Sequence, residues 1–242
     1  MDDSLKILTY NIHKGFGVAN FRFVLHQIRA ALEATKADLV FLQEVQGKHR
    51  KRPVAQFMFL AENFWPHYAY GKNALYRGGH HGNAILSKFP FLMWENISLA
   101  KYKCASRSLL HAVIEIPKIN KNMHIICIHF ALFKTQSRKQ LIVLKNRIID
   151  RIPEDAPLII AGDFNDWRGQ AERFLETELA LKEVFKVTQG HHTKTFPIWS
   201  PKLAVDRIYY RNLKLDSCQR LHQMPWRKLS DHVPLYAEFL LY

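Results

Sequence analysis

The 242-residue sequence lacks the features that mark membrane-spanning and disulfide-stabilised proteins. Its three cysteines, Cys104, Cys127 and Cys218, are widely separated and form no CxxC pair, so reduced thiols fit better than a disulfide framework. No stretch reaches the ~18 uncharged apolar residues that a membrane-spanning helix needs. The acidic start MDDSLK leads directly into an apolar run, and we expect no signal peptide. These absences favour a cytoplasmic protein, which could also bind peripherally at a membrane surface.

Acidic residues are scarce relative to basic ones. The chain has 35 Lys and Arg against 21 Asp and Glu, which gives a formal net charge of +14. Such an excess suits an anionic partner, for example nucleic acid, an acidic membrane surface or a phosphorylated small molecule. A soluble protein can also simply be basic, so the charge narrows the class of partner without naming it.

Short apolar runs rich in strand-forming residues recur along the chain. Several are apolar at nearly every position, as expected for strands that are covered on both faces. The runs cover residues 5–12, 37–44, 82–87, 108–116, 123–130, 157–164, 204–210 and 234–241.

Helical patterns lie between these runs. Apolar residues at three- and four-residue spacing predict a helix across Phe21 to Leu32, with Asn20 available as its N-cap, and another across Leu141 to Ile152. Weaker patterns predict helices at about 54–63 and about 169–178. The chain has no repeat and no Gly/Ser linker, so we predict one α/β domain over residues 1–242, with sheets packed face to face and helices outside.

Many of the apolar runs begin or end with asparagine, glutamate, histidine or aspartate. Because strand ends and loops usually carry function, these residues suggest a single shared site. The residues concerned are Asn11, Glu44, His129, Asp163, Asn165, Asp206, Asp231 and His232.

The chemistry open to this set is limited. Carboxylate and amide oxygens such as those of Glu44, Asp231 and Asn11 suit Mg²⁺ or Mn²⁺. Asp206 could orient His232 as a general base for water. A hard metal, a histidine–aspartate pair and extra hydrogen-bond donors fit the hydrolysis of phosphoesters, where developing charge on oxygen must be stabilised.

Each of these residues also has a simpler explanation when it is taken alone. Asp163 and Asp166 could be turn formers, and His129 could be a satisfied core histidine. We interpret Asp166 as a turn or helix-start residue. Gly162 is expected to let the chain bend close to a phosphate, and Phe196 could either border the site or pack against a strand.

Seven motifs, taken in their order along the chain, favour a role in a shared site over these simpler explanations. LTYNIHKG, FLQEV, GNAILS, IHF, IAGDFND, DRIYY and LSDHVPL span Thr9 to Leu235. Together they resemble the endonuclease/exonuclease/phosphatase superfamily, the deoxyribonuclease I-like metal-dependent phosphoesterases. NIHKGF, HHGNAILS and GDFNDW look more narrowly like small bacterial hydrolases often encoded near cardiolipin synthases. The resemblance implies a four-layer α/β sandwich of two central β-sheets flanked by helices, with the site at one rim.

The resemblance also implies a role for each site residue. The metal ligands for Mg²⁺, or for Mn²⁺ as a substitute, would be Glu44, Asn11 and Asp231. The catalytic residues would be Asp163, Asn165, His129, Asp206 and His232. The substrate would be contacted by Arg107, Asn83 and His81. Either Asp163 or His232 could activate the water.

Three functions remain open at this stage. The leading one is a Mg²⁺-dependent phosphodiesterase, nuclease-like, in which an activated water attacks phosphorus in line. The alternative is a phospholipid or phosphoinositide-type phosphodiesterase or phosphatase, which the narrower resemblance favours. The chain also has little room for the long insertions with which DNA-repair relatives hold duplex DNA, and this weakens a sequence-independent nuclease. A non-catalytic module that binds anionic ligands is the third, although it would not need the full residue set. We expect a monomer.

Overall fold

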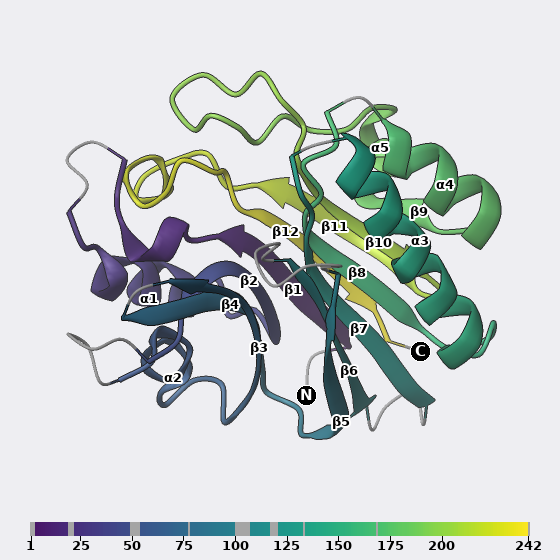
Figure 1. The fold of residues 1–242 in the computed structure, drawn as a ribbon, viewed down its shortest axis with the longest axis horizontal. Helices are drawn as coiled ribbons and strands as arrows, with labels where there is room; N and C mark the ends of the chain where they lie inside the picture. The colour runs from purple at the N-terminus through teal and green to yellow at the C-terminus, as the bar shows by residue number, and fades with distance from the viewer. Residues whose placement is uncertain are drawn as a thin grey trace.

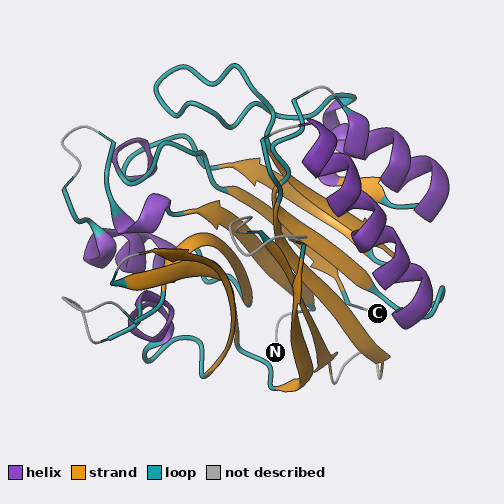
Figure 2. Ribbon diagram, in the orientation of Figure 1, coloured by secondary structure: helices purple, strands orange, loops and turns teal. Residues whose placement is uncertain are grey.

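The computed structural model describes residues 3–18, 22–48, 54–76, 78–99, 107–116, 121–132, 134–167 and 169–241. Two six-stranded β-sheets pack face to face, and helices lie on their outer faces (Figures 1 and 2). The four-layer α/β sandwich implied by the resemblance is confirmed. None of the helices formed by the described residues is long and apolar enough to cross a membrane.

Each sheet combines neighbours from distant parts of the chain. Sheet 1 has the order β11 (Lys214–Arg220), β12 (Leu235–Leu240), β1 (Ser4–Asn11), β2 (Leu39–Gln46), β4 (Gly79–Ser87) and β3 (His67–Tyr76). Sheet 2 has the order β5 (Phe91–Ser98), β6 (Ser108–Ile116), β7 (Lys121–His129), β8 (Leu158–Asp163), β10 (Asp206–Arg211) and β9 (Lys182–Glu183). The neighbours β1 and β2 run parallel, as do β7 and β8, while the other pairs run antiparallel.

Three layers of apolar side chains hold the sheets and helices together. The layer between the sheets includes Ile7, Ile125 and Phe239. A second layer lies between sheet 1 and the helices α1 (Leu25–Ala34) and α2 (Gln56–Ala61). The third lies between sheet 2 and the helices α3 (Lys134–Arg151) and α4 (Gln170–Leu179), which run side by side across that face (Figure 1). The inner strands are therefore covered on both faces, which explains their nearly continuous apolar runs.

Three more short helices occur among the described residues. They are the 3-10 helix η1 (His13–Gly15), the α-helix α5 (Val184–Gln189) and the 3-10 helix η2 (Trp226–Lys228). The first predicted helix begins at Leu25, later than Phe21, and the expected cap Asn20 lies outside the described residues. The helix expected from Leu141 begins earlier, at Lys134. The sequence patterns did not predict β3, β5, β9 and β11.

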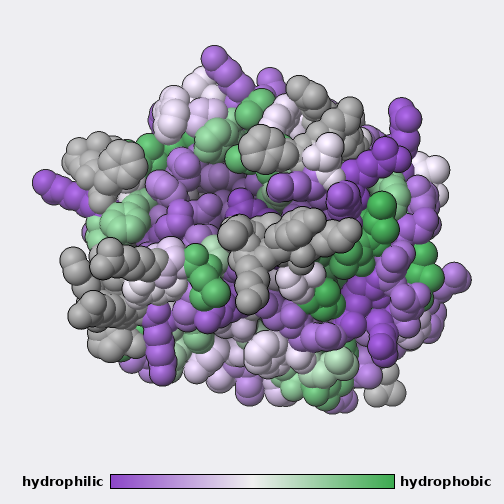
Figure 3. All heavy atoms as spheres, viewed as in Figure 1, coloured by the Kyte–Doolittle hydropathy of each residue, from purple (hydrophilic) through white to green (hydrophobic). Residues whose placement is uncertain are grey.

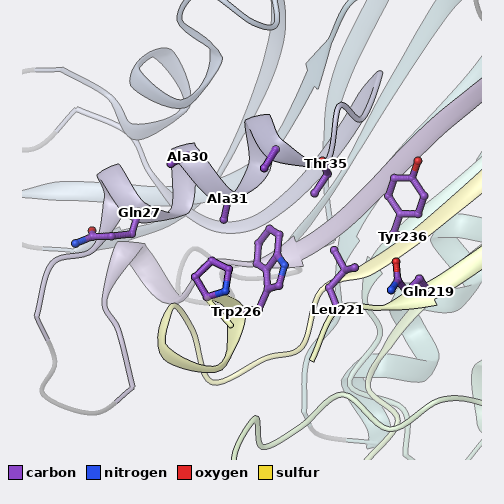
Figure 4. A pocket seen from close by; sticks show the side chains of 10 residues that line it. Gln27, Ala30, Ala31, Thr35, Gln219, Leu221, Trp226 and Tyr236 are labelled. Atoms are coloured by element: carbon purple, nitrogen blue, oxygen red, sulfur yellow. The ribbon is translucent and has the colours of Figure 1, made fainter. Parts of the chain in front are cut away.

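Sheet 1 is only partly covered by helices on the side of β11 and β12. A groove of about 670 Å³ lies there beside α1, lined mainly by Ala30, Ala31, Leu221, Trp226 and Tyr236 (Figure 4). None of the predicted site residues lines this groove.

Candidate active site

The sheet register brings three predicted site residues into one row. In the parallel pair β7–β8, His129 lies opposite Asp163, and in the antiparallel pair β8–β10, Asp163 lies opposite Asp206. In sheet 1, β1 ends at Asn11, which lies opposite Gln43 of the parallel strand β2, the residue before Glu44. Strand pairing alone therefore gathers His129, Asp163 and Asp206, although 77 positions separate the first from the last in the sequence.

Asp163 lies at the centre of the site and is 1% exposed. Its Oδ2 accepts a hydrogen bond from Asn11 Nδ2 at 3.2 Å and lies 3.4 Å from His129 Nε2 and 3.9 Å from His232 Nε2. Its Oδ1 accepts a bond from the backbone N–H of Asn165 at 3.0 Å. Side chains from both sheets thus converge on one buried carboxylate.

His232 and Asp206 form the predicted pair. His232 Nδ1 lies 2.9 Å from Asp206 Oδ2, and both side chains are buried. The backbone N–H of Asp206 donates to the hydroxyl of Thr195 at 3.2 Å, and the ring of Phe196 lies 5.0 Å from the imidazole of His232. Phe196 therefore borders the site, and its neighbour Thr195 helps to hold Asp206.

Burial and mutual charge set the protonation of these groups. Burial raises the pKa of Asp163 to about 7, although the positive charge of His232 opposes the rise. Burial lowers the pKa of His232, but the carboxylate of Asp206 outweighs it and raises that pKa to about 10. Burial also holds the pKa of His129 well below its usual range, and Arg107 adds to this effect. At neutral pH, His232 is therefore charged and His129 is neutral.

Glu44 is presented by an irregularity in β2. The pairing of β2 with β4 shifts register between Leu42 and Val45, and Glu44 has φ +56°, which is uncommon for a residue other than glycine. Its Oε2 lies 2.9 Å from Lys14 Nζ. Burial raises the pKa of Glu44, but His129 and Lys14 outweigh it and lower the pKa to about 2, so the side chain is a carboxylate.

Asp231 lies on the other side of β1. Its Oδ1 accepts a hydrogen bond from Ser230 Oγ at 3.2 Å and lies 3.9 Å from His13 Nδ1. The backbone oxygen of Asn11 lies closer to the same hydroxyl, at 2.7 Å, and is the alternative acceptor for its single proton. Asp231 is therefore fixed to the end of β1, next to Asn11.

In the segment from Gly162 to Asp166, some residues belong to the site and others only stabilise the fold. Asn165 has φ +48°, and its Nδ2 donates to the backbone oxygen of Phe130 at 2.9 Å. Phe164 is fully buried in the layer between sheet 2 and its helices. Asp166 accepts a bond from the backbone N–H of Ala171 at 2.6 Å, close to the start of α4, as its interpretation as a helix-start residue predicts.

Gly162 is required by its contact with the neighbouring strand, and the approach to a phosphate that we expected of it stays a prediction. Its φ is +146°, and an added Cβ would lie 2.0 Å from the backbone oxygen of Ile128 on the neighbouring strand. The close approach of β7 therefore accounts for the glycine without an approach to phosphate.

The three residues predicted to contact substrate lie in different surroundings. Arg107 Nε donates to the backbone oxygen of Phe130 at 3.2 Å, and its charge acts on both Asp163 and Glu44. Half-buried His81 lies close enough to Glu44 for the two to affect each other's pKa. Asn83 is fully buried, and its Nδ2 donates to the backbone oxygen of Ser108 at 3.0 Å, so this contact joins the two sheets.

Carboxylates such as those of Glu44 and Asp231 are the kind of ligand that a hard divalent metal takes in proteins. Both are partly exposed, with side-chain exposures of 19% and 27%. Asn11 Oδ1 accepts a bond from the backbone N–H of His13 at 3.1 Å, so its amide already orients both that turn and Asp163.

A second arrangement of possible ligands also exists. Within the described part of the chain, one set of three carboxylate or imidazole groups has all its ligand atoms within 4.8 Å: Asp163, Asp206 and His232. All three groups are buried, and His232 Nδ1 lies 2.9 Å from Asp206 Oδ2, while the buried Asp206 Oδ1 accepts no hydrogen bond from the described residues.

Sequence reasoning missed three residues that contact the predicted site residues: Lys14, Ser230 and Thr195. Lys14 and Ser230 lie inside the motifs LTYNIHKG and LSDHVPL, next to predicted residues, so the motifs contained the signal. Thr195 adjoins Phe196 but lies far in sequence from both Asp206 and His232, and only the folded chain reveals its role.

Comparison with known proteins identifies the family. The sequence model of the Endonuclease/Exonuclease/phosphatase family matches residues 8–232. The chain belongs to this family. Its members are phosphoester hydrolases and usually use a divalent metal. The uncharacterized protein YbhP of Escherichia coli strain K12 is 39% identical over 246 aligned residues, which cover 98% of this chain and 97% of YbhP.

Solved structures share the fold at lower identity. An endonuclease/exonuclease/phosphatase from Beutenbergia cavernae has a TM-score of 0.80 and 18% identity, covering 98% of this chain and 72% of its own. TDP2 from D. rerio, complexed with a single-strand DNA product, has a TM-score of 0.74 and 21% identity, covering 98% of this chain and 99% of its own. The human Nocturnin catalytic domain with bound sulfate has a TM-score of 0.74 and 18% identity, covering 100% and 96%.

Proposed function

We propose that the chain is a Mg²⁺-dependent phosphodiesterase in which an activated water attacks phosphorus in line. The observation that carries this proposal is the environment of Asp163, a buried carboxylate within 3.9 Å of the side-chain nitrogens of Asn11, His129 and His232. A carboxyl group with a raised pKa beside a charged histidine suits proton transfer at neutral pH.

In this mechanism Asp163 takes the proton from the attacking water. Its pKa of about 7 leaves it substantially ionised at neutral pH and still basic enough to accept a proton. His232 is already protonated, because Asp206 raises its pKa, so it is the weaker candidate for the base. Its charge instead stabilises the negative oxygens of the phosphoryl group.

The neighbouring polar groups orient the reactants. Asn11 holds Asp163 through the bond to Oδ2, and the backbone N–H of Asn165 holds Oδ1. His129 and Asn165 supply donors beside the carboxylate, and Arg107 adds positive charge for a phosphate. Glu44 and Asp231 would hold the Mg²⁺, with Asn11 beside them, and the bound ion would polarise the phosphoryl oxygen.

The substrate is held on a polar face of the molecule in this proposal. The carboxyl end of β1 and the long loop between α5 and β10 lie on the upper side of the view in Figure 1. Hydrophilic side chains gather just below the loop in the same orientation (Figure 3). A polar surface on a chain with a formal net charge of +14 suits the charged backbone of nucleic acid, which makes a nuclease-like substrate the first choice.

A phospholipid is the second candidate, favoured by apolar side chains that follow the site residues. Leu132, Trp167 and Trp199 are 57%, 41% and 61% exposed. Leu132 lies three residues after His129, and Trp167 lies two residues after Asn165. Exposed large apolar residues of this kind can enter a membrane interface.

A substrate panel tests the proposal. Plasmid DNA, RNA, a chromogenic bis-phosphodiester, phosphoinositides and phosphatidylglycerol vesicles would each be incubated with Mg²⁺, Mn²⁺ or EDTA. Metal-dependent turnover of nucleic acid would support the first candidate, and turnover of lipid alone would support the second. No metal-dependent turnover of any member would overturn both and leave a module that binds anionic ligands.

A further inference from the structure

The turn after β1 has an unusual backbone. His13, Lys14 and Gly15 are three successive residues with positive φ, at +44°, +56° and +78°. Residues other than glycine adopt this region at a cost, and such strain persists only where the surroundings fix it. The turn therefore depends on specific contacts.

Hydrogen bonds from both sides fix the turn. The backbone N–H of His13 donates to Asn11 Oδ1 at 3.1 Å, and that of Gly15 donates to the backbone oxygen of Ile12 at 2.8 Å. The backbone oxygen of Lys14 accepts a bond from Gln56 Nε2 at 2.7 Å. Gln56 is itself buried and accepts a bond from the backbone N–H of Gln46 on β2. The turn is thus tied to β1, β2 and α2.

The two side chains of this turn reach opposite neighbours of β1. Lys14 Nζ lies 2.9 Å from Glu44 Oε2 on β2, and His13 Nδ1 lies 3.9 Å from Asp231 Oδ1, just before β12. Because β1 lies between β2 and β12 in the sheet, successive residues after its end can contact both sides. These two carboxylates are the ones that the proposed function gives to Mg²⁺.

We infer that Lys14 is a competitor of the divalent metal: its ammonium pairs with Glu44 Oε2 and must leave that oxygen when the ion binds there. This inference rests on the assignment of Glu44 to the metal under the proposed function. A cation and an ammonium group repel each other and cannot both lie within bonding distance of one carboxylate oxygen. If Lys14 occupies Glu44 for ~90% of the time, the apparent affinity for metal falls about tenfold.

Direct measurement of Mn²⁺ binding to the full chain tests this competition without any substrate. Titration calorimetry would compare the wild type with K14M and with K145M, a matched control that removes another lysine–glutamate pair, Lys145–Glu178 on α3 and α4. The control accounts for the general effect of losing one positive charge. E44Q identifies which binding event belongs to the site.

We expect K14M to bind Mn²⁺ about tenfold more tightly than K145M, and E44Q to lose that binding. K14Q should behave like K14M, which guards against a folding defect in one variant. Affinity in both Lys14 variants that is equal to or weaker than that of K145M would overturn the inference. The inference would also be overturned if the wild type showed no Mn²⁺ binding that E44Q removes. Tight binding without turnover would instead count against the proposed function alone.

Discussion

Replacing Asp163 with asparagine should abolish turnover and, at the same time, stabilise the fold at alkaline pH. Burial raises the pKa of this carboxyl group from 3.8 to about 7. Between these two values the unfolded chain ionises the group while the folded chain keeps it protonated, so the wild type loses stability as the pH rises through this window. Asparagine carries no charge and removes that loss.

The magnitude follows from the difference between the two pKa values. At 1.36 kcal/mol for each pKa unit, ionisation of Asp163 costs the fold at most about 4 kcal/mol above pH 7. An amide nitrogen in place of Oδ2 would lose the bond from Asn11 Nδ2, which costs about 1 kcal/mol. We therefore expect Asp163→Asn to raise the free energy of unfolding by at most about 3 kcal/mol at about pH 8, and to give no gain at about pH 4.

Urea denaturation at these two pH values measures the effect. The matched control is Asp166→Asn, three residues further on, where the carboxylate accepts the Ala171 N–H and pairs with buried Arg207 at 3.4 Å. Removal of that charge leaves Arg207 unpaired and should destabilise the fold by about 3 kcal/mol. Equal destabilisation by both variants at alkaline pH, or a gain from Asp163→Asn that does not change with pH, would refute the reasoning.

Three further predictions concern pH and positioning. The rate should rise with pH as Asp163 ionises near 7 and fall as His232 loses its proton near 10, and a flat pH–rate profile would contradict these roles. Thr195→Val removes the acceptor for the Asp206 N–H and should lower kcat about tenfold with little change in KM. Thr195→Ser keeps the hydroxyl and should retain activity. Equal loss of activity in both variants would contradict the role of the hydroxyl. Burial and the charge of Arg147 lower the pKa of His111 to about 3, so the wild type should lose stability as the pH falls from about 6.5. The variant His111→Gln should lose less stability over this range. Equal acid sensitivity of the two proteins in urea denaturation would contradict this.

The inner strands could be predicted because both of their faces are buried. β7 and β8 are apolar at most positions, since one face packs against the other sheet and the other face packs against helices. The patterns missed β3, β5, β9 and β11, and these are the four strands at the sheet edges. An edge strand is more exposed and mixes polar residues among apolar ones, as the sequence KLDSCQR of β11 does.

The types of the site residues and their places at strand ends predicted a shared site, and the fold brings Asn11, His129, Asp163, Asp206 and His232 together. Their roles in catalysis stay predictions. The sequence could not predict the contacts that depend on backbone geometry. The left-handed conformation of Lys14 and the bulge that presents Glu44 arise from long-range pairing, and neither has a local sequence signal.

Hydrolysis of a chromogenic bis-phosphodiester tests the central claim most directly. The wild type, Asp163→Asn and the surface control Asp155→Asn, whose side chain is 79% exposed, would be compared with Mg²⁺ and with EDTA. The proposed mechanism predicts turnover by the wild type and the control that requires Mg²⁺, and a loss of at least ~10²-fold in Asp163→Asn. Turnover that persists in EDTA, or a folded Asp163→Asn variant that turns over like the wild type, would contradict it.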